Sequence, residues 1–397
     1  MRFPRLTRRS FFKTAAAGTA VAAAVGVLSG CTHTSDEQTS DPVVVDEDSA
    51  ENVLDSFEQV DSTLVEENAW TIALGNVLHP AEGAWIPVTT AGSSATPMVK
   101  GSALSVSSGQ LVEVVSAPIG QSTTTVIYDV RCSDSVYAWV ELDLVTRAWT
   151  LYASSFSGGE LTGDTKTLWE GDSDFDPAPF AVTGDLVIWQ VQPAVGGSRT
   201  AESSHCYLWR SGDSEAKAVV ESPGRFATAP TVSGDVVTLT PRVRADQGVY
   251  YGVTAYSLDD DLAVMPQSVR PFRASRVGER FLVSVEASYS SGGLLGQMGT
   301  YIGTADGGFF RISAEPSEGG CGKGDVVIVK VLNAASAYYV VDVANRTYSG
   351  ISSVDRSLDY GEFPARAGEC DLFVTFSTVK DADTGYPASV SVRTFRL

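Results

Sequence analysis

A short pattern recurs along most of this chain and limits what the chain can fold into. Each copy has a tight turn, an acidic residue and a β-rich run, as in TGDLVIWQVQ from Thr183 and KGDVVIVKVL from Lys323. The acids of the six copies are spaced by 51, 50, 44, 46 and 46 residues, and they are Asp134, Asp185, Asp235, Glu279, Asp325 and Asp371. A fixed period of this size indicates one supersecondary unit used many times.

Each period contains the same four strands. A short strand precedes the acid, the strongest strand follows it, and two further strands end the unit, for example SHCYLWRS and AKAVVES. From about residue 70 onward, β-branched and aromatic runs alternate with Gly, Asp, Ser and Pro clusters. Four antiparallel strands per unit of about 40–50 residues are the sequence form of a β-propeller blade. We therefore predict an all-β fold, a β-propeller of four-stranded antiparallel blades, in which the repeated acid serves the turn.

The last period is incomplete, because the chain stops at Leu397 before a fourth strand. We predict that an N-terminal strand, WTIAL at Trp70 to Leu74, completes the last blade and closes the ring. Residues 82–116 then form a further, degenerate blade, whose turn is expected near Glu82 or Gly83. This gives seven blades, and six is the alternative if residues 70–118 form a lid or a partial blade.

The first 30 residues read as an export signal. Basic residues precede a small apolar run from Ala15 to Leu28, which is the pattern of a signal peptide. TRRSFFK, with Arg8, Arg9, Phe11 and Lys13, resembles the twin-arginine export signal. LSGC, made of Leu28, Ser29, Gly30 and Cys31, resembles a bacterial lipobox. The resemblance implies cleavage before Cys31 and lipidation of its thiol, and the alternative is an uncleaved signal anchor with a chance cysteine.

Residues 31–68 are expected to be a lipidated cysteine and an acidic, disordered tether. Residues 32–68 contain twelve acids and no Lys or Arg, and such a composition cannot bury enough apolar surface to fold alone. Val53, Leu54 and Phe57 predict one short helical turn at most. The propeller domain is then residues 69–397, held by lipid at the outer face of the cytoplasmic membrane, or in the periplasm or outer membrane where these exist.

The charge of the chain restricts its partners. The formal net charge is −20, and removal of residues 1–30 takes away five bases and no acids, which leaves 23 bases, 48 acids and −25. Such a surface repels nucleic acids and anionic headgroups, so membrane attachment has to come from the lipid on Cys31. Solubility explains the acidity most simply, and attraction of cations or basic partners is the alternative.

Few residues are available for metal, redox or nucleophilic chemistry. Four cysteines follow the lipobox, namely Cys132, Cys206, Cys321 and Cys370. They contain no C-x-x-C pair, and they allow three disulfide connectivities. The three histidines, His33, His79 and His205, exclude a His-rich metal centre by count. No catalytic or metal-binding residue is therefore assigned, and no cofactor is expected.

Three acidic clusters of the sequence are candidate binding sites. Asp172, Asp174 and Asp176 in GDSDFDP could converge on Ca²⁺, although an inter-blade turn is the preferred interpretation. Asp259 to Asp261 and the KDADTGYP segment from Lys380 are expected to be solvated hairpin tips.

The repeated turn, acid and strand over residues 126–397 resembles the propellers of the TolB family and of prolyl oligopeptidase relatives. The resemblance implies a fold and no catalytic residues, because no Gly-x-Ser-x-Gly elbow is present. Trp139 and Trp189 fall in central strands, where packing between blades explains them.

Two long loops suggest where such a propeller could bind. Pro193 to His205 and Ala287 to Gly299 both follow second strands, so they should emerge on the same side of the ring. We expect a non-enzymatic binding or scaffold module for an envelope protein or glycan. The alternative is a glycan-acting hydrolase or lyase, which a cluster of carboxylates with Arg or Tyr at one mouth of the channel would favour.

Overall fold

The computed structural model describes residues 50–62, 64–92, 98–245, 248–258, 267–268, 273–285, 298–304, 307–317, 320–331 and 336–397. These residues belong to one of two compact units of the chain, Thr39–Leu397. The other unit, with every residue of the predicted export signal and lipobox, lies outside the described residues. Within the described residues, α1 (Val53–Ser56) is the only helix, and no helix there is long and apolar enough to cross a membrane.

The described strands form seven sheets, each named here by its strands in chain order. The β4–β7 sheet contains Asn76–Leu78, Trp85–Thr90, Lys100–Ser105 and Leu111–Val115. The β8–β12 sheet contains Thr125–Cys132, Val136–Asp143, Trp149–Ser157, Glu160–Leu161 and Lys166–Gly171. The β13–β16 sheet contains Phe180–Thr183, Leu186–Val191, Ser204–Arg210 and Lys217–Ser222. The β17–β21 sheet contains Thr231–Ser233, Val236–Leu239, Arg242–Ala245, Gly248–Ser257 and Gln267–Ser268.

The second half of the chain supplies the other sheets. The β22–β25 sheet contains Arg273–Val277, Arg280–Val285, Gly299–Thr304 and Gly307–Ser313. The β26–β29 sheet contains Gly320–Lys323, Val326–Lys330, Tyr338–Asp342 and Thr347–Ile351, with β31 (Gly368–Glu369) added beside β26. The closing sheet contains β30 (Ser357–Pro364), β32 (Leu372–Lys380), β33 (Pro387–Arg396) and β3 (Glu66–Ala73).

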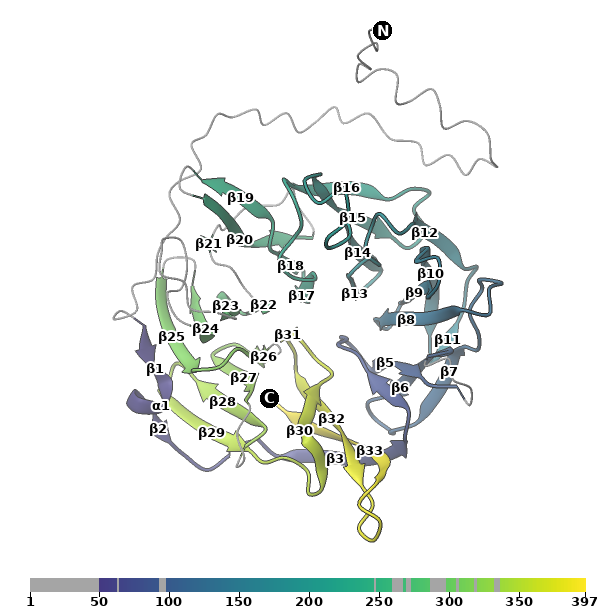
Figure 1. Cartoon of the computed structure of the whole chain (residues 1–397). Coiled ribbons are helices and arrows are strands. Elements are labelled where there is room, and N and C mark those ends of the chain that lie inside the picture. The colour runs from purple at the N-terminus through teal and green to yellow at the C-terminus, as the bar shows by residue number, and fades with distance from the viewer. Residues whose placement is uncertain are drawn as a thin grey trace, which may run out of the picture. The chain divides into compact units, whose positions relative to one another are not determined.

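The sheets of this unit stand around one centre, with β8, β13, β17 and β26 toward the middle (Figure 1). This arrangement confirms the predicted all-β β-propeller. In six of the described sheets the principal strands follow one another along the chain, with β1 added to the β22–β25 sheet and β2 and β31 added to the β26–β29 sheet. Six blades is the alternative predicted from the sequence. The favoured count of seven requires the closing sheet, whose strands come from both ends of the unit, to be counted as a blade, and that count is not confirmed.

The predicted ring closure by an N-terminal strand is confirmed. β3 pairs antiparallel with β33, with Trp70 opposite Val392 and Ile72 opposite Val390. Ile72 and Val392 lie in a buried cluster that also includes Ile86 of the next sheet. The start of the unit therefore joins its end through both backbone hydrogen bonds and apolar packing.

The repeated acids lie where the sequence places them, in the turn between the first and second strands of a sheet, called here the inner turn. Gly184, Gly234, Gly278 and Gly324 each precede an acid, and their φ angles are +50°, +58°, +55° and +57°. A positive φ at the first central position is what a type II′ hairpin requires, and glycine adopts it without strain. Gly83 has the same role in the degenerate unit, with φ +84°.

The acids of the inner turns also connect neighbouring sheets. Asp134 Oδ1 accepts a hydrogen bond of 2.7 Å from Ala84 N, as expected for a carboxylate in a turn. Asp325 instead binds Arg280 at 2.5 Å, an arginine of the preceding sheet. Turn chemistry and contact between blades therefore both explain the acid, and neither requires catalysis.

Part of the predicted tether is folded against the propeller, which corrects the prediction for residues 51–59. β1 (Glu51–Asn52) pairs parallel with β25, and β2 (Glu58–Gln59) pairs parallel with β29. Val53 and Phe57 are buried in the cluster formed by these sheets. Glu51 forms a two-bonded ion pair with Arg346. The segment is ordered because it covers exposed sheet edges and neutralises a cation there.

Residues 51–73 therefore form a belt along the outer edges of three sheets. Figure 1 shows β1, α1, β2 and β3 on the outside of the β22–β25, β26–β29 and closing sheets.

The tryptophans of the central strands behave as predicted. Trp139 and Trp189 are 1% and 0% exposed. Trp139 lies in a buried cluster with Ala103 of the preceding sheet, and Trp189 lies in one with Val140 of the preceding sheet.

Candidate functional site

The first candidate site begins at a bulge in β8. The pairing of β8 with β9 shifts between Ile127 and Asp129, so that Tyr128 is the extra residue. A bulge bends its strand and changes the direction of the neighbouring side chains. Tyr128 is consequently 51% exposed on an inner strand, and Asp129 reaches the preceding sheet.

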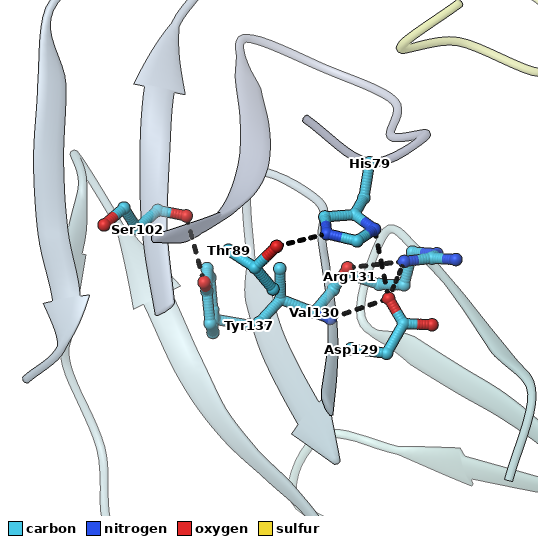
Figure 2. Close-up of polar contacts among 7 residues, drawn as sticks. All are labelled: His79, Thr89, Ser102, Asp129, Val130, Arg131 and Tyr137. Carbon is cyan, nitrogen blue, oxygen red and sulfur yellow. Dashed lines mark hydrogen bonds and ion pairs between the residues drawn. The ribbon is translucent and has the colours of Figure 1, made fainter. Parts of the chain in front are cut away.

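Asp129 meets His79, which follows directly after β4. Figure 2 shows His79 between Thr89 and Asp129, with Arg131 beside it on the same carboxylate oxygen. His79 Nδ1 lies 3.2 Å from Asp129 Oδ1, and His79 Nε2 lies 2.9 Å from Thr89 Oγ1. Arg131 forms an ion pair with the same Asp129 oxygen. The guanidinium of Arg131 also lies 5.5 Å from the centre of the Phe180 ring, so the cluster extends into a third sheet.

Burial keeps this imidazole neutral. Desolvation lowers the pKa of His79 to about 4, the charge of Asp129 opposes that shift, and the charge of Arg131 adds to it. A neutral imidazole has one donor and one acceptor. His79 therefore donates from Nδ1 to Asp129 and accepts the Thr89 hydroxyl proton at Nε2.

The order hydroxyl, imidazole, carboxylate is that of a nucleophilic triad, and its chemical use depends on access. Thr89 is 2% exposed within β5, so a substrate carbonyl cannot reach its oxygen. Asp129, moreover, is shared with Arg131. In this structure the cluster joins three blades and places one charged pair on the inner strands. Sequence analysis did not find this cluster, because His79 and Asp129 are 50 residues apart and a bulge brings them together.

Two carboxylates and an arginine also meet at the inner turns. Arg366 donates hydrogen bonds of 2.9 and 2.5 Å to two carbonyls of the turn that contains Glu82. Glu82 Oε2 accepts a bond of 2.8 Å from Thr183 Oγ1, and Asp134 accepts the Ala84 N–H. Arg366, Glu82 and Asp134 are each bonded to a sheet other than their own. The cluster therefore connects blades through their inner turns.

A second candidate site is the connection between β14 and β15, residues 192–203, which we call the presenting loop. The sequence predicts a long loop here after a second strand, and the structure confirms that position. Ala194 N donates to Asp174 O at 2.9 Å, and Phe175 forms an isolated β-bridge with Pro193. Val195, near the tip, is 76% exposed.

The acidic cluster Asp172, Asp174 and Asp176 holds this loop in place. Arg199 Nε of the loop lies 3.1 Å from Asp174 Oδ2, and Val195 N of the loop donates to Asp176 Oδ2 at 3.3 Å. Arg225, which pairs with Asp176 Oδ2 at 2.8 Å, also donates to Pro193 O of the loop. The segment 172–179 connects β12 to β13, as the inter-blade interpretation predicts. Within the described residues no group of three or more metal-ligating side chains is found, and Ca²⁺ binding stays a prediction.

Cys321 and Cys370 are the two cysteines that contact each other. β26 and β31 pair in parallel, and Cys370 N donates to Gly322 O at 2.8 Å. The hydrogen bond from Cys321, and after it the charge of Arg366, lower the pKa of Cys370. Burial raises the pKa of the Cys321 thiol. None of the four described cysteines forms a disulfide in this structure, and of the three connectivities only the one that joins Cys321 to Cys370 contains a contacting pair.

The remaining predicted positions divide into two groups. The segment after Lys380 is a hairpin tip, as predicted, in which Asp381 Oδ1 accepts from Thr384 N at 2.9 Å. The other predicted positions lie outside the described residues. They are Asp259 to Asp261, most of Ala287 to Gly299, and the export and lipidation residues, which are Arg8, Arg9, Phe11, Lys13, Leu28, Ser29, Gly30 and Cys31.

Comparisons with solved structures identify the fold. The chain is similar to the β-propeller domain of the Trilobed protease of Pyrococcus furiosus, with 11% identity, a TM-score of 0.52, and coverage of 77% of this chain and 92% of that one. It is similar to the acylaminoacyl peptidase of Pyrococcus horikoshii, with 12% identity, a TM-score of 0.50, and coverage of 79% of this chain and 50% of that one. TolB from Acinetobacter baumannii is 13% identical, with a TM-score of 0.40 and coverage of 70% and 62%.

These similarities show the fold alone. The chain spans about half the length of the Pyrococcus horikoshii peptidase, and the Trilobed protease domain has an open velcro topology, whereas the described chain closes its ring with β3. The resemblance to peptidase-type propellers is supported at the level of the fold. No protein-family model and no curated protein matches the sequence.

Proposed function

We propose that this chain is a lipid-anchored, extracytoplasmic β-propeller that binds an envelope protein or a glycan without transforming it. The observation that carries the proposal is the presenting loop, residues 192–203. Backbone bonds, a β-bridge, the Arg199–Asp174 ion pair and hydrogen bonds with Asp176 and Arg225 hold this loop. A loop that is ordered before binding loses little conformational entropy when it meets a partner.

The chemistry of the inner strands agrees with binding. The imidazole of His79 is neutral and the hydroxyl beside it is buried, so the cluster does not supply an accessible nucleophile. Tyr128, exposed on the same strand as Asp129 and Arg131, offers an aromatic ring beside a charged pair. Such a combination suits recognition of a polar ligand with flat apolar faces.

The anchor part of the proposal concerns Cys31 and the twin-arginine signal around Arg8 and Arg9. Replacement of Cys31 by Ser should abolish incorporation of a labelled fatty acid into the protein while its export continues. Replacement of both arginines by Lys should instead leave the precursor in the cytoplasm. Unchanged fatty acid incorporation into the Cys31→Ser protein would contradict lipid anchoring at Cys31.

The binding part is tested by loop exchange in intact cells. Residues 193–203 are replaced by a short Gly-Ser turn, and partners are captured by chemical crosslinking. As a matched control, the β15–β16 turn, residues 211–216, is replaced in the same way, because it belongs to the same sheet and lies at the other end of β15. We expect capture to be lost only with the first exchange, and equal capture by both variants would refute the role of the loop.

A glycan-acting hydrolase or lyase is the second candidate, and the Asp129, His79 and Arg131 cluster is the observation that favours it. Purified protein is incubated with envelope polysaccharide, and new reducing or unsaturated ends are measured. Activity that disappears in Asp129→Asn would establish this candidate and refute the non-enzymatic proposal. Absence of new ends under conditions where the crosslinked partner is captured supports binding alone.

A further inference from the structure

The connections between strands fall on two sides of the ring. In a sheet of four antiparallel strands, the first–second and third–fourth connections emerge at one end, and the second–third connection and the link to the next sheet emerge at the other. We call the end that carries the first–second and third–fourth connections the turn side. We call the end that carries the second–third connection and the link to the next sheet the link side. Residues 133–135 and 158–165 of the β8–β12 sheet lie on the turn side, and residues 144–148 and 172–179 lie on the link side.

Exposed large apolar side chains gather on the link side. Val145, Val195 and Tyr386 are 74%, 76% and 75% exposed, and each lies in a second–third connection. Leu74, Ile119 and Leu144 are 49%, 44% and 44% exposed and lie in connections of the same side. Among the described hairpin turns of the turn side, none carries an exposed large apolar residue, and Val65, 70% exposed just before β3, is the one such described residue outside the strands at that end. Single exposed residues are ordinary on any surface, whereas this one-sided distribution requires an explanation.

These six residues, which we call the apolar rim, belong to consecutive sheets. The closing sheet contacts the β4–β7 sheet through Ala81 N and Ala365 O, 3.2 Å apart. The β4–β7 sheet contacts the β8–β12 sheet through His79 and Asp129. The latter contacts the β13–β16 sheet through Arg131 and the Phe180 ring. The apolar rim therefore follows one arc of the ring over four neighbouring sheets.

The same arc is acidic. The link-side connections that contain or adjoin the rim residues, 74–75, 116–124, 144–148, 172–179, 192–203 and 381–386, contain six acids and two arginines. Anionic headgroups are repelled by such a surface, and a basic protein is attracted and steered toward it. Apolar tips surrounded by acids are therefore complementary to a protein whose surface carries apolar pockets among basic residues.

The point at which the described chain begins gives the orientation of this surface. β25 is the fourth strand of its sheet, so it runs from the turn side to the link side, and β1 is parallel to it. The described chain thus enters the propeller on the turn side, and the apolar rim lies on the opposite side of the ring.

We infer that the apolar rim is the docking surface for a second envelope protein, one whose contact surface is basic and contains apolar pockets. The inference rests on the proposed function, because it names the surface and the partner class of the same binding module. The rim excludes two other occupants on physical grounds. An anionic bilayer is disfavoured by the acids of the arc, and a second copy of this chain would bring two acidic arcs together.

The test uses the full, lipidated chain in intact cells. A photoreactive phenylalanine analogue is placed at Val145, Val195 or Tyr386, and in the controls at Ser214 or Asn345, which are exposed residues of turn-side connections. We expect the three rim positions to yield one and the same protein adduct, and the controls to yield none. That protein is then purified and titrated with wild type and with the Val145→Ser/Tyr386→Ser variant. We expect at least tenfold weaker binding by the variant, weaker binding of wild type at high salt, and unchanged urea unfolding of the variant.

Each other outcome overturns the inference in a distinguishable way. Lipid adducts, or flotation of the unlipidated chain with phosphatidylglycerol vesicles that the variant loses, identify a membrane contact. Adducts to another copy of the chain identify self-association. Capture by the presenting loop without any rim adduct refutes the rim and leaves the proposed function standing. If neither the rim nor the loop captures a protein or glycan, the proposed function itself fails.

Discussion

The closing sheet contains a buried ion pair whose loss should be costly. Arg393 on β33 donates to Glu362 Oε1 from Nε at 2.8 Å and from a terminal nitrogen at 2.5 Å. The Glu362 side chain is 0% exposed and that of Arg393 is 14% exposed. Thr375 Oγ1 donates to the same carboxylate oxygen at 2.6 Å. Arg393 also reaches Glu66 of β3 at 3.3 Å, so one guanidinium links three strands of this sheet.

Replacement of Arg393 by Met keeps the apolar stem and removes the charge. Glu362 then remains buried with one hydroxyl donor, while its Oε2 has no hydrogen-bond partner among the described residues. Breaking a buried pair in this way costs about 3–5 kcal/mol. A folded protein has about 5–15 kcal/mol of total stability, so the variant should lose a large fraction of it. We expect urea unfolding, followed by tryptophan fluorescence and circular dichroism, to show a much lower midpoint.

Two matched variants test the reasoning. Arg396, also on β33, forms a two-bonded pair with Glu67 of β3, but its side chain is 63% exposed. Arg396→Met should leave the midpoint within error, because exposed pairs contribute little. Glu362→Leu/Arg393→Met, which removes both charges, should regain most of the lost stability. Equal midpoints for Arg393→Met and Arg396→Met would refute the argument that burial sets the cost.

Three further predictions concern single residues. Because the pKa of His79 is about 4 in the folded protein and 6.5 without perturbation, the unfolded chain protonates first. Stability should fall by about 3 kcal/mol between pH 6.5 and 4, and His79→Gln should show a flatter profile over this range in urea titrations. In native protein at neutral pH, iodoacetamide should modify Cys370 before Cys206. The hydrogen bond from Cys321 lowers the pKa of the Cys370 thiol, whereas burial raises the pKa of the Cys206 thiol. Mass spectrometry of the digested protein measures the order of modification. Gly368→Ala should lower the unfolding midpoint, since φ is +74° and a Cβ would lie 2.4 Å from a carbonyl of another sheet; an unchanged midpoint would contradict the described close approach.

The repeated unit could be predicted because its signals are local. Glycine and an acid at the inner turn, followed by a run of β-branched residues, specify a hairpin within about ten residues. Ring closure by Trp70 to Leu74 could also be predicted, because the last period lacked a strand. The period thus indicated the propeller without any knowledge of which sheets touch.

The belt and the inner-strand cluster could not be predicted, because both depend on distant contacts. Composition alone places Glu51 to Gln59 in a disordered tether, and only the edges of β25 and β29, with Arg346 beside them, order this segment. Asp129 reaches His79 only because Tyr128 is bulged. A bulge is a property of two paired strands, so one strand's sequence does not reveal it.

The belt also determines how the propeller responds to mechanical load. Tension that reaches Ala50 acts first on β1 and then on β2, each of which pairs with its neighbour through only two residues. β3, which closes the ring, pairs along most of its length and would be the last of the three to yield. The first two pairings can therefore detach and lengthen the connection by several residues while the closing sheet stays intact. A protein pulled from its N-terminal end would absorb the load in the belt before the ring opens.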